Sequence, residues 1–146
     1  MVFASTVHVG VYFEKNLSSW ATTNYYGAGS TRVAMRVGSS TVYWLLGDHL
    51  GSASLATNSS GGVIANSSTR YYPYGATRSG GTGLPTDYRF TGQRDDGYIN
   101  LYFMGARQYD PQLGRWISAD TLVPDPANPQ SLNRYSYVLG NPACVA

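Results

Sequence analysis

The chain has 146 residues, a formal net charge of +2 and only 12% charged residues. Its length corresponds to about one domain. Soluble domains usually carry roughly 25% charged residues, so the composition favours part of a larger assembly over a free-standing secreted β-domain. A single cysteine, Cys144, excludes an intramolecular disulfide and a metal site built from several cysteines.

Other classes of protein receive little support from the sequence. The arginines are scattered and form no basic block, so we expect no nucleic-acid partner. The first residues lack the basic and apolar segments of a signal peptide. No apolar run approaches the roughly 20 residues that a membrane span requires.

The N-terminal part alternates apolar and polar residues in the manner of β-strands. Val33, Met35 and Val37 share one face of a predicted strand. That strand covers residues 31–37, and a Gly-containing turn at 38–40 returns the chain. Similar Tyr-, Thr- and Val-rich runs predict strands over residues 7–13, 20–26, 41–46, 53–57, 63–72 and 88–91.

Turns and loops separate these runs. Residues 14–16 and 92–97 are polar and predict turns, whereas residues 79–86 are rich in Gly, Thr and Pro and predict an exposed loop. Three prolines within residues 123–129 exclude a regular helix or a central strand there. Ser131 can cap a short helix over residues 132–138. The predicted fold class is therefore all-β, built from antiparallel hairpins, with one short C-terminal helix.

We expect the chain to be organised around residues 98–120, which contain five aromatic residues. The pattern predicts a strand over 98–103, a bend and then an extended run over 107–109. Residues 110–115 predict a turn, because Asp can accept bonds from the following backbone, Pro presets φ and Gly takes a positive φ.

An ordered series of short motifs runs from residue 48 to residue 142. It comprises DHLGS at 48–52, NSSG at 58–61, YPYG at 72–75, FTGQR at 90–94, LYFMGARQYDP at 101–111, LGRWIS at 113–118, Asp120, NRYSYV at 133–138 and NP at 141–142. In this order the motifs resemble the Rhs repeat-associated core. The motif residues are Asp48, His49, Gly51, Tyr74, Gly75, Gly92, Arg94, Tyr102, Gly105, Arg107, Tyr109, Asp110, Pro111, Gly114, Trp116, Asn133 and Tyr135.

The resemblance also divides the chain. Residues 1–47 resemble the tail of the YD-repeat hairpins that precede such a core, and residues 48–142 are the core itself. Residues 143–146 are a divergent or truncated tail, because the family's second motif, Asp-Pro-x-Gly, does not follow.

The resemblance implies a structural role. In this family YD repeats form a β-sheet that spirals into a hollow shell, and the core is similar to a plug near its C-terminal end. We therefore expect a non-enzymatic module that closes or lines a shell around a C-terminal toxin or effector. Its partners would be the upstream YD-repeat shell and that cargo, within a longer bacterial protein that is secreted or at the cell surface. No cofactor is expected.

One alternative function is enzymatic. In processed family members, an aspartate matching Asp120 and a second aspartate are implicated in self-cleavage, where two carboxylates can share a proton. Arg115 could support Asp120 electrostatically, or act as a structural donor or as the partner of Asp110. Because nothing matches the second aspartate, a turn role for Asp120 is favoured and self-cleavage is not expected.

Other polar groups have structural explanations. His49 is expected in a turn rather than in catalysis, and the spacing of Asp95, Asp96 and Asn100 does not match a calcium loop. Glycosylation triplets begin at Asn16, Asn58 and Asn66. A third possible role is self-association, because open strand edges with few charges pair readily with one another.

Overall fold

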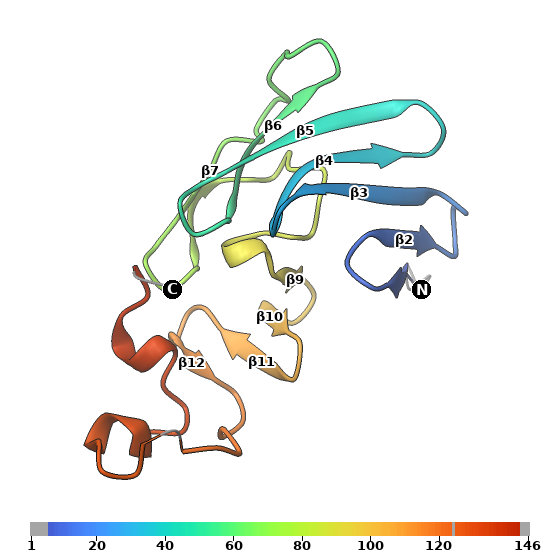
Figure 1. Cartoon of the computed structure of the whole chain (residues 1–146). Coiled ribbons are helices and arrows are strands. Elements are labelled where there is room, and N and C mark those ends of the chain that lie inside the picture. The colour runs from blue at the N-terminus through green and yellow to red at the C-terminus, as the bar shows by residue number, and fades with distance from the viewer. Residues whose placement is uncertain (1–5, 124, 144–146) are drawn as a thin grey trace.

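The computed structural model describes residues 6–123 and 125–143, which form two antiparallel sheets and a separate hairpin (Figure 1). The larger sheet has six strands that pair in sequence order. These strands are β1 (Thr6–Val9), β2 (Phe13–Asn16), β3 (Thr22–Ala28), β4 (Thr31–Val37), β5 (Thr41–Gly47) and β6 (Ala53–Asn58).

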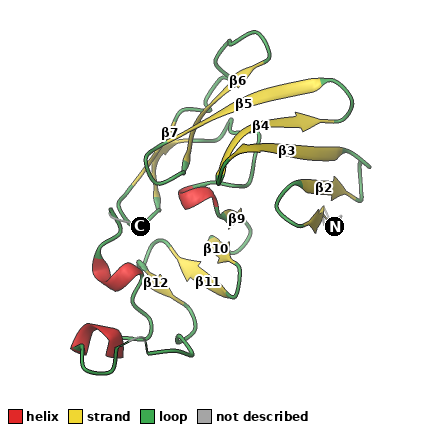
Figure 2. Cartoon of the chain, viewed as in Figure 1, coloured by secondary structure: helices red, strands yellow, loops and turns green. Residues whose placement is uncertain are grey.

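The C-terminal half forms the smaller sheet, in the order β12-β11-β10-β9. Between the two sheets in sequence lies a two-stranded hairpin. The bounds are β7 (Thr69–Tyr71), β8 (Thr77–Gly80), β9 (Arg94–Asp96), β10 (Leu101–Met104), β11 (Arg107–Asp110) and β12 (Arg115–Trp116). Strands and loops make up nearly all of the described chain (Figure 2), and none of its helices is long and apolar enough to cross a bilayer. The all-β prediction is confirmed.

The alternation in β4 sets the core of the larger sheet. Met35 lies between Tyr25 and Tyr43 in the cross-strand register and is buried, as its predicted face requires. The core cluster on this face consists of Tyr25, Met35, Leu45, Ala56, Leu84 and Tyr88. On the opposite face Tyr26 and Trp44 remain about half exposed.

The predicted position of the first turn was wrong. Residues 7–13 are split between β1 and β2, and the turn falls at residues 10–12 instead of 14–16. Gly10 takes a φ of +61° in that turn. Glu14 pairs with His8 in the ladder and is buried, so its segment continues the sheet.

The predicted exposed loop over residues 79–86 is partly buried. Leu84 packs in the core of the larger sheet, and Thr86 is only 3% exposed. Glycines allow this close packing: a Cβ at Gly81 would lie 2.7 Å from the Thr69 hydroxyl, and one at Gly83 would collide with the Ala65 carbonyl. The Gly-rich composition predicted an exposed loop. In the structure the same glycines instead allow this segment to pack closely against neighbouring backbone.

The segment after this loop also differs from the prediction. Instead of a strand over 88–91, the chain forms a 3₁₀ turn, η1 (Phe90–Gly92), with Thr91 at a φ of +49°. Residues 94–96 of the predicted turn form β9, because they pair with β10.

The predicted helix over residues 132–138 is replaced by two flanking 3₁₀ turns, η2 (Pro129–Leu132) and η3 (Val138–Gly140). Asn128, rather than Ser131, caps η2 by accepting a bond from the Gln130 N–H. The residues between the turns pair with β12: the Trp116 N–H donates to the Tyr135 carbonyl at 3.0 Å. Tertiary pairing thus replaces the local helix.

Candidate functional site

An aromatic cluster occupies the inner face of the smaller sheet. Its buried members are Phe90, Tyr102, Tyr109 and Tyr137. Tyr109 is fully buried, and its ring centroid lies 4.5 Å from that of Tyr137. Trp116 packs edge-on against both of these rings, at 5.7 and 5.8 Å, and is itself only partly buried. The stretch predicted to organise the chain therefore supplies two of the buried rings, Tyr102 and Tyr109, and the Trp116 ring at the rim.

The tyrosine hydroxyls tie this sheet to the turn that joins β7 to β8. Tyr109 donates to the Tyr74 carbonyl at 2.8 Å, and Tyr102 donates to the Gly75 carbonyl at 3.3 Å. Burial raises the pKa of both phenols, so both stay protonated as donors. Tyr74 in turn donates to the Gly140 carbonyl at 3.2 Å. Three distant segments are joined in this way.

Two motif glycines allow these segments to approach. Gly75 has a φ of +91°, and a Cβ there would collide with the Phe90 ring. Gly114 has a φ of +66°, and a Cβ there would lie 2.9 Å from the Tyr74 ring. Each position combines a left-handed backbone with close ring packing, and only glycine satisfies both.

The turn at residues 110–115 matches its prediction. The Asp110 carboxylate accepts bonds from the Gln112 and Leu113 N–H groups at 2.8 and 3.0 Å. The Gly114 N–H donates to the Asp110 carbonyl at 2.9 Å. Asp110 and Arg115 are partners in the register of β11 and β12. The turn thereby places Trp116 beside Tyr109.

Asp120 lies in an ion pair with Arg107, whose Nη2 is 2.7 Å from Oδ2 of the carboxylate. The Arg107 guanidinium also stacks over the Trp116 ring, at 3.9 Å from the centroid. The Leu122 N–H donates to the same carboxylate at 3.1 Å, so Asp120 also forms a turn. The Leu122 N–H, and then the Arg107 charge, hold the pKa of Asp120 below its ordinary value. An ionised, paired carboxylate is poorly suited to act as an acid.

Among the described residues Arg115 forms no ion pair with Asp120 or with Asp110. Its guanidinium lies over Tyr135 at 5.4 Å, and its side chain is exposed. Arg107 is the arginine at Asp120, an assignment that the motif alone did not provide. The link is the bond from the Ile117 N–H to the Gln108 carbonyl, which carries the chain after β12 alongside β11. That pairing is not visible in the sequence.

The remaining motif residues mainly form turns and edge contacts. The Asp48 carboxylate accepts bonds from the Leu50 and Ser52 N–H groups, each at 2.9 Å, while His49 is exposed. Gly51 and Gly105 have positive φ angles. The Gly92 carbonyl accepts a bond from Arg32, and Arg94 lies over the Phe103 ring. The Asn133 side chain accepts a bond from the Tyr135 N–H. Pro111 lies partly buried in the Asp110 turn.

The other candidate polar groups also have local partners. Asp95 lies 3.4 Å from Arg89, and burial raises its pKa while that cation lowers it. Among the described residues no group of three His, Cys, Asp or Glu is placed to hold a metal ion. The carboxamides of Asn16 and Asn58 accept bonds from nearby backbone N–H groups, and Asn66 has a φ of +58°. Cys144 lies outside the described residues.

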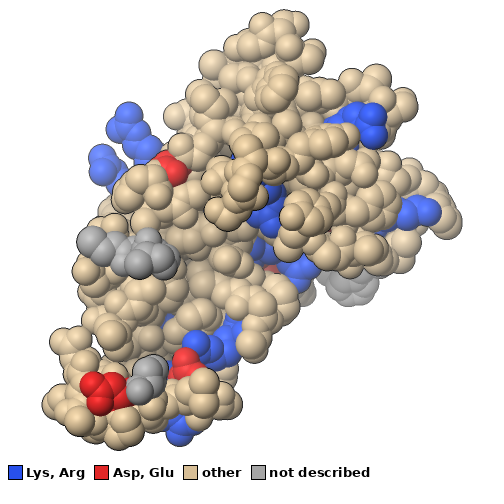
Figure 3. Space-filling model, in the orientation of Figure 1, with Lys and Arg blue, Asp and Glu red and all other residues tan. Residues whose placement is uncertain are grey.

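The larger sheet is a series of hairpins paired in sequence order, and tyrosine hydroxyls of the smaller sheet bind the turn between β7 and β8. The chain belongs to the Teneurin YD-shell family, whose model matches residues 9–143. This confirms the predicted YD-repeat/Rhs shell family. Figure 3 shows charged side chains scattered over a mostly uncharged face.

Curated relatives and solved structures agree with this assignment. Toxin subunits YenC1 and YenC2 of Yersinia entomophaga are 36% and 38% identical to the chain over 99 and 97 residues, which cover 64% and 62% of it. The crystal structure of TcdB2-TccC3 without its hypervariable C-terminal region matches with a TM-score of 0.68 and 26% identity over 91% of the chain. The chain spans 9% of the length of each Yen subunit and 7% of the TcdB2-TccC3 chain.

Proposed function

We propose that this chain is a non-enzymatic module that closes or lines a β-shell around a C-terminal toxin or effector. The observation that carries the proposal is the YD-shell match over residues 9–143. The covered sheet faces fit this role, because loops from the second half of the chain pack on the larger sheet. The shell would belong to a longer bacterial protein that is secreted or at the cell surface.

An upstream YD-repeat segment is the partner that suits the β1 edge of the larger sheet, which has no paired strand among residues 6–123 and 125–143. Strand β1 is the outermost strand of that sheet, and its residues Val7 and Val9 are 43% and 60% exposed. Because β1 to β6 pair in sequence order, a preceding hairpin would extend the sheet in the same way. We place the core at residues 48–142, with β6 of the core continuing the sheet of residues 1–47.

A chimera tests the closing role. We would replace the matched segment of YenC1 with this chain and measure how fast added protease degrades the residues that follow it. Enclosure predicts slow degradation, comparable to that in the parent subunit. A matched chimera with Tyr109→Ala should lose the protection. Equal degradation in the chimera and in an unrelated-linker control would refute the proposal.

The aspartate-protease alternative is less well supported. Asp120 is ion-paired with Arg107, and this favours the charged form over the proton donor. Intact mass after prolonged incubation should stay unchanged in the wild-type chain and in Asp120→Asn. A mass loss in the wild type that disappears in the variant would restore the enzymatic role.

Self-association is the remaining alternative, and the feature that favours it is the β1 edge, which is unpaired in the described part of the chain. Light scattering coupled to size-exclusion chromatography would distinguish the two structural roles. A monodisperse monomer contradicts a self-assembling module, whereas large species that disappear on adding an upstream shell segment support the shell role.

A further inference from the structure

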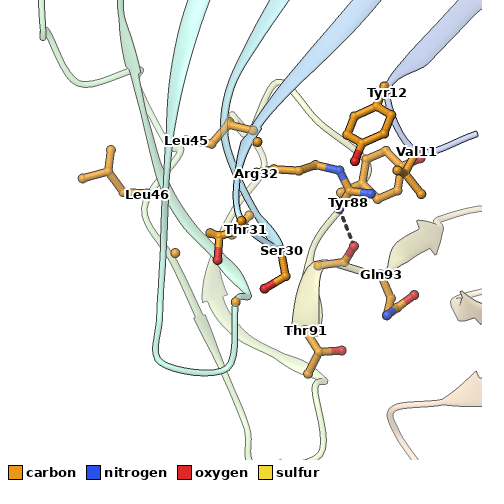
Figure 4. A pocket seen from close by; sticks show the side chains of 16 residues that line it. Val11, Tyr12, Ser30, Thr31, Arg32, Leu45, Leu46, Tyr88, Thr91 and Gln93 are labelled. Carbon is orange, nitrogen blue, oxygen red and sulfur yellow. Dashed lines mark hydrogen bonds between the residues drawn. The ribbon is translucent and has the colours of Figure 1, made fainter.

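A cleft of about 400 Å³ lies where four parts of the chain meet (Figure 4). Its walls come from the turn after β1, the ends of the β3–β4 and β5–β6 hairpins, and the segment around η1. This volume lies within the ordinary range for small-molecule and peptide side-chain sites, roughly 300–1,000 Å³. The family match assigns no role to this cleft.

The cleft contains one cation and no carboxylate among its described lining residues. The cation is Arg32 of β4, whose guanidinium stacks on the Tyr88 ring at 3.5 Å and lies 5.7 Å from that of Tyr25. Its Nη1 donates to the Gly92 carbonyl at 2.7 Å. Stacking and this bond fix the plane of the guanidinium before any ligand arrives.

Arg32 forms no ion pair with the described part of the chain. The close contacts found there between basic and acidic side chains join His8 to Glu14, Arg89 to Asp95 and Arg107 to Asp120. The Nε atoms of Arg32 and of Arg36 are both buried without a hydrogen-bond acceptor, so the feature that distinguishes Arg32 is its place in the cleft lining. A partly buried cation without an ion-pair partner is stabilised when an oxyanion supplies the missing charge.

The remaining lining residues indicate which chemical group would lie next to the bound anion. Val11 and Leu45 provide apolar surface, and Ser30, Thr31 and Gln93 add polar side chains to the lining. Five of the lining residues are glycines, which leave backbone walls without side chains: Gly27, Gly29, Gly47, Gly51 and Gly92. A flat or branched apolar group next to an oxyanion matches these surfaces.

We propose that this cleft is a binding site for a carboxylate carried on an apolar group, with Arg32 as its anchor. Two sources share this chemistry: a glutamate beside a leucine in an extended peptide, and a small free branched-chain carboxylic acid. The site stands independently of the shell role, because it rests on Arg32 and its surroundings alone.

Calorimetric titration of the purified chain tests this site with three probes. N-acetyl-Leu-Glu-amide carries the carboxylate, N-acetyl-Leu-Gln-amide is its neutral isostere, and 4-methylpentanoate is a small free acid. The glutamate dipeptide should bind at least about tenfold more tightly than the glutamine dipeptide, since one charged hydrogen-bonded contact is lost. Equal affinity of the two dipeptides, or no binding of any probe, would overturn the proposal.

The free acid distinguishes the two sources. If 4-methylpentanoate binds as tightly as the glutamate dipeptide, the site takes a small carboxylic acid. If it binds far more weakly, the site takes a peptide. Inorganic phosphate should bind much more weakly than either carboxylate, and phosphate binding of equal strength would refute the need for an apolar body.

Substitutions of two arginines of β4 test whether carboxylate binding depends on Arg32. Arg32→Gln should weaken the carboxylate probes by roughly ten- to a hundredfold. Arg36→Gln removes the same charge from the same strand, outside the cleft lining, and should leave binding unchanged. Equal loss in both variants would mean general charge attraction and would refute the site.

A second variant keeps the test valid if Arg32→Gln fails to fold. Ser30 is exposed in the β3–β4 turn and lines the cleft, so Ser30→Asp should preserve the fold and place a competing carboxylate near Arg32. We expect the same ranking of probes with weaker binding of the glutamate dipeptide. Unchanged affinity in Ser30→Asp would argue against the cleft.

Discussion

The two sheets are held together in different ways. The larger sheet has strands of up to seven residues and a core of mixed aliphatic and aromatic side chains. The smaller sheet has strands of two to four residues and a core whose buried members are all aromatic. Because such short strands contribute few ladder bonds, the smaller sheet depends on tyrosine hydroxyls bonded to distant carbonyls. We therefore expect the larger sheet, with its longer ladders, to lose less stability than the smaller sheet when one core side chain is removed.

Tyr109→Ala should have the largest effect. The ring is fully buried, and its loss leaves a cavity and unpairs the Tyr74 carbonyl, which should cost about 3–5 kcal/mol of unfolding free energy. Urea denaturation measures this cost. Met35→Ala in the larger sheet is the comparison, expected at about 2–4 kcal/mol. If Met35→Ala lost more unfolding free energy than Tyr109→Ala, the larger sheet would be the one that depends more on a single side chain.

Gly75→Ala should cost about 2–4 kcal/mol, because the new Cβ meets the Phe90 ring and the residue must keep a positive φ. Gly38→Ala is the matched control, since Gly38 also has a positive φ but no atom within 4 Å of its Cβ position. That control should lose only about 1–2 kcal/mol. Equal shifts in the two urea midpoints would show that ring packing at Gly75 contributes nothing.

Trp116→Ala should cost less, about 1–2 kcal/mol, because the indole ring is only partly buried at the rim of the cluster. A cost of about 3–5 kcal/mol would require a fully buried ring. Thermal melts with Trp20→Ala as a control would check this, since Trp20 is 69% exposed. Identical melting curves for wild type and Trp116→Ala would remove the indole from the organising cluster.

The smallest effect concerns pH and the larger sheet. Burial raises the pKa of Glu14, although His8 at 3.2 Å and the Tyr25 hydroxyl oppose the shift. A carboxyl with a raised folded pKa adds stability below its unfolded pKa and loses that stability as pH rises through the folded value. The stability of wild type relative to Glu14→Gln should therefore increase as pH falls from about 8 to about 4. Urea titrations across this pH range measure the stability difference between the two proteins. A difference that shrinks as pH falls would contradict the prediction.

Local sequence rules determined several elements of this protein. The alternation of β4 and the turn from Asp110 to Gly114 follow from side-chain periodicity, an acceptor carboxylate and a glycine at positive φ. The ordered motifs also identified the shell family. These features depend on residues that are near one another along the chain, so the sequence alone contains them.

Only the tertiary structure decided the remaining features, because each depends on contacts between distant residues. Pairing with His8 places Glu14 in a strand instead of a turn. The path after β12 brings Asp120 to Arg107, and the contact between β4 and the η1 segment sets Arg32 on Tyr88. Burial against other strands and loops, rather than local preference, fixes these positions, and it creates both the aromatic cluster and the cationic cleft.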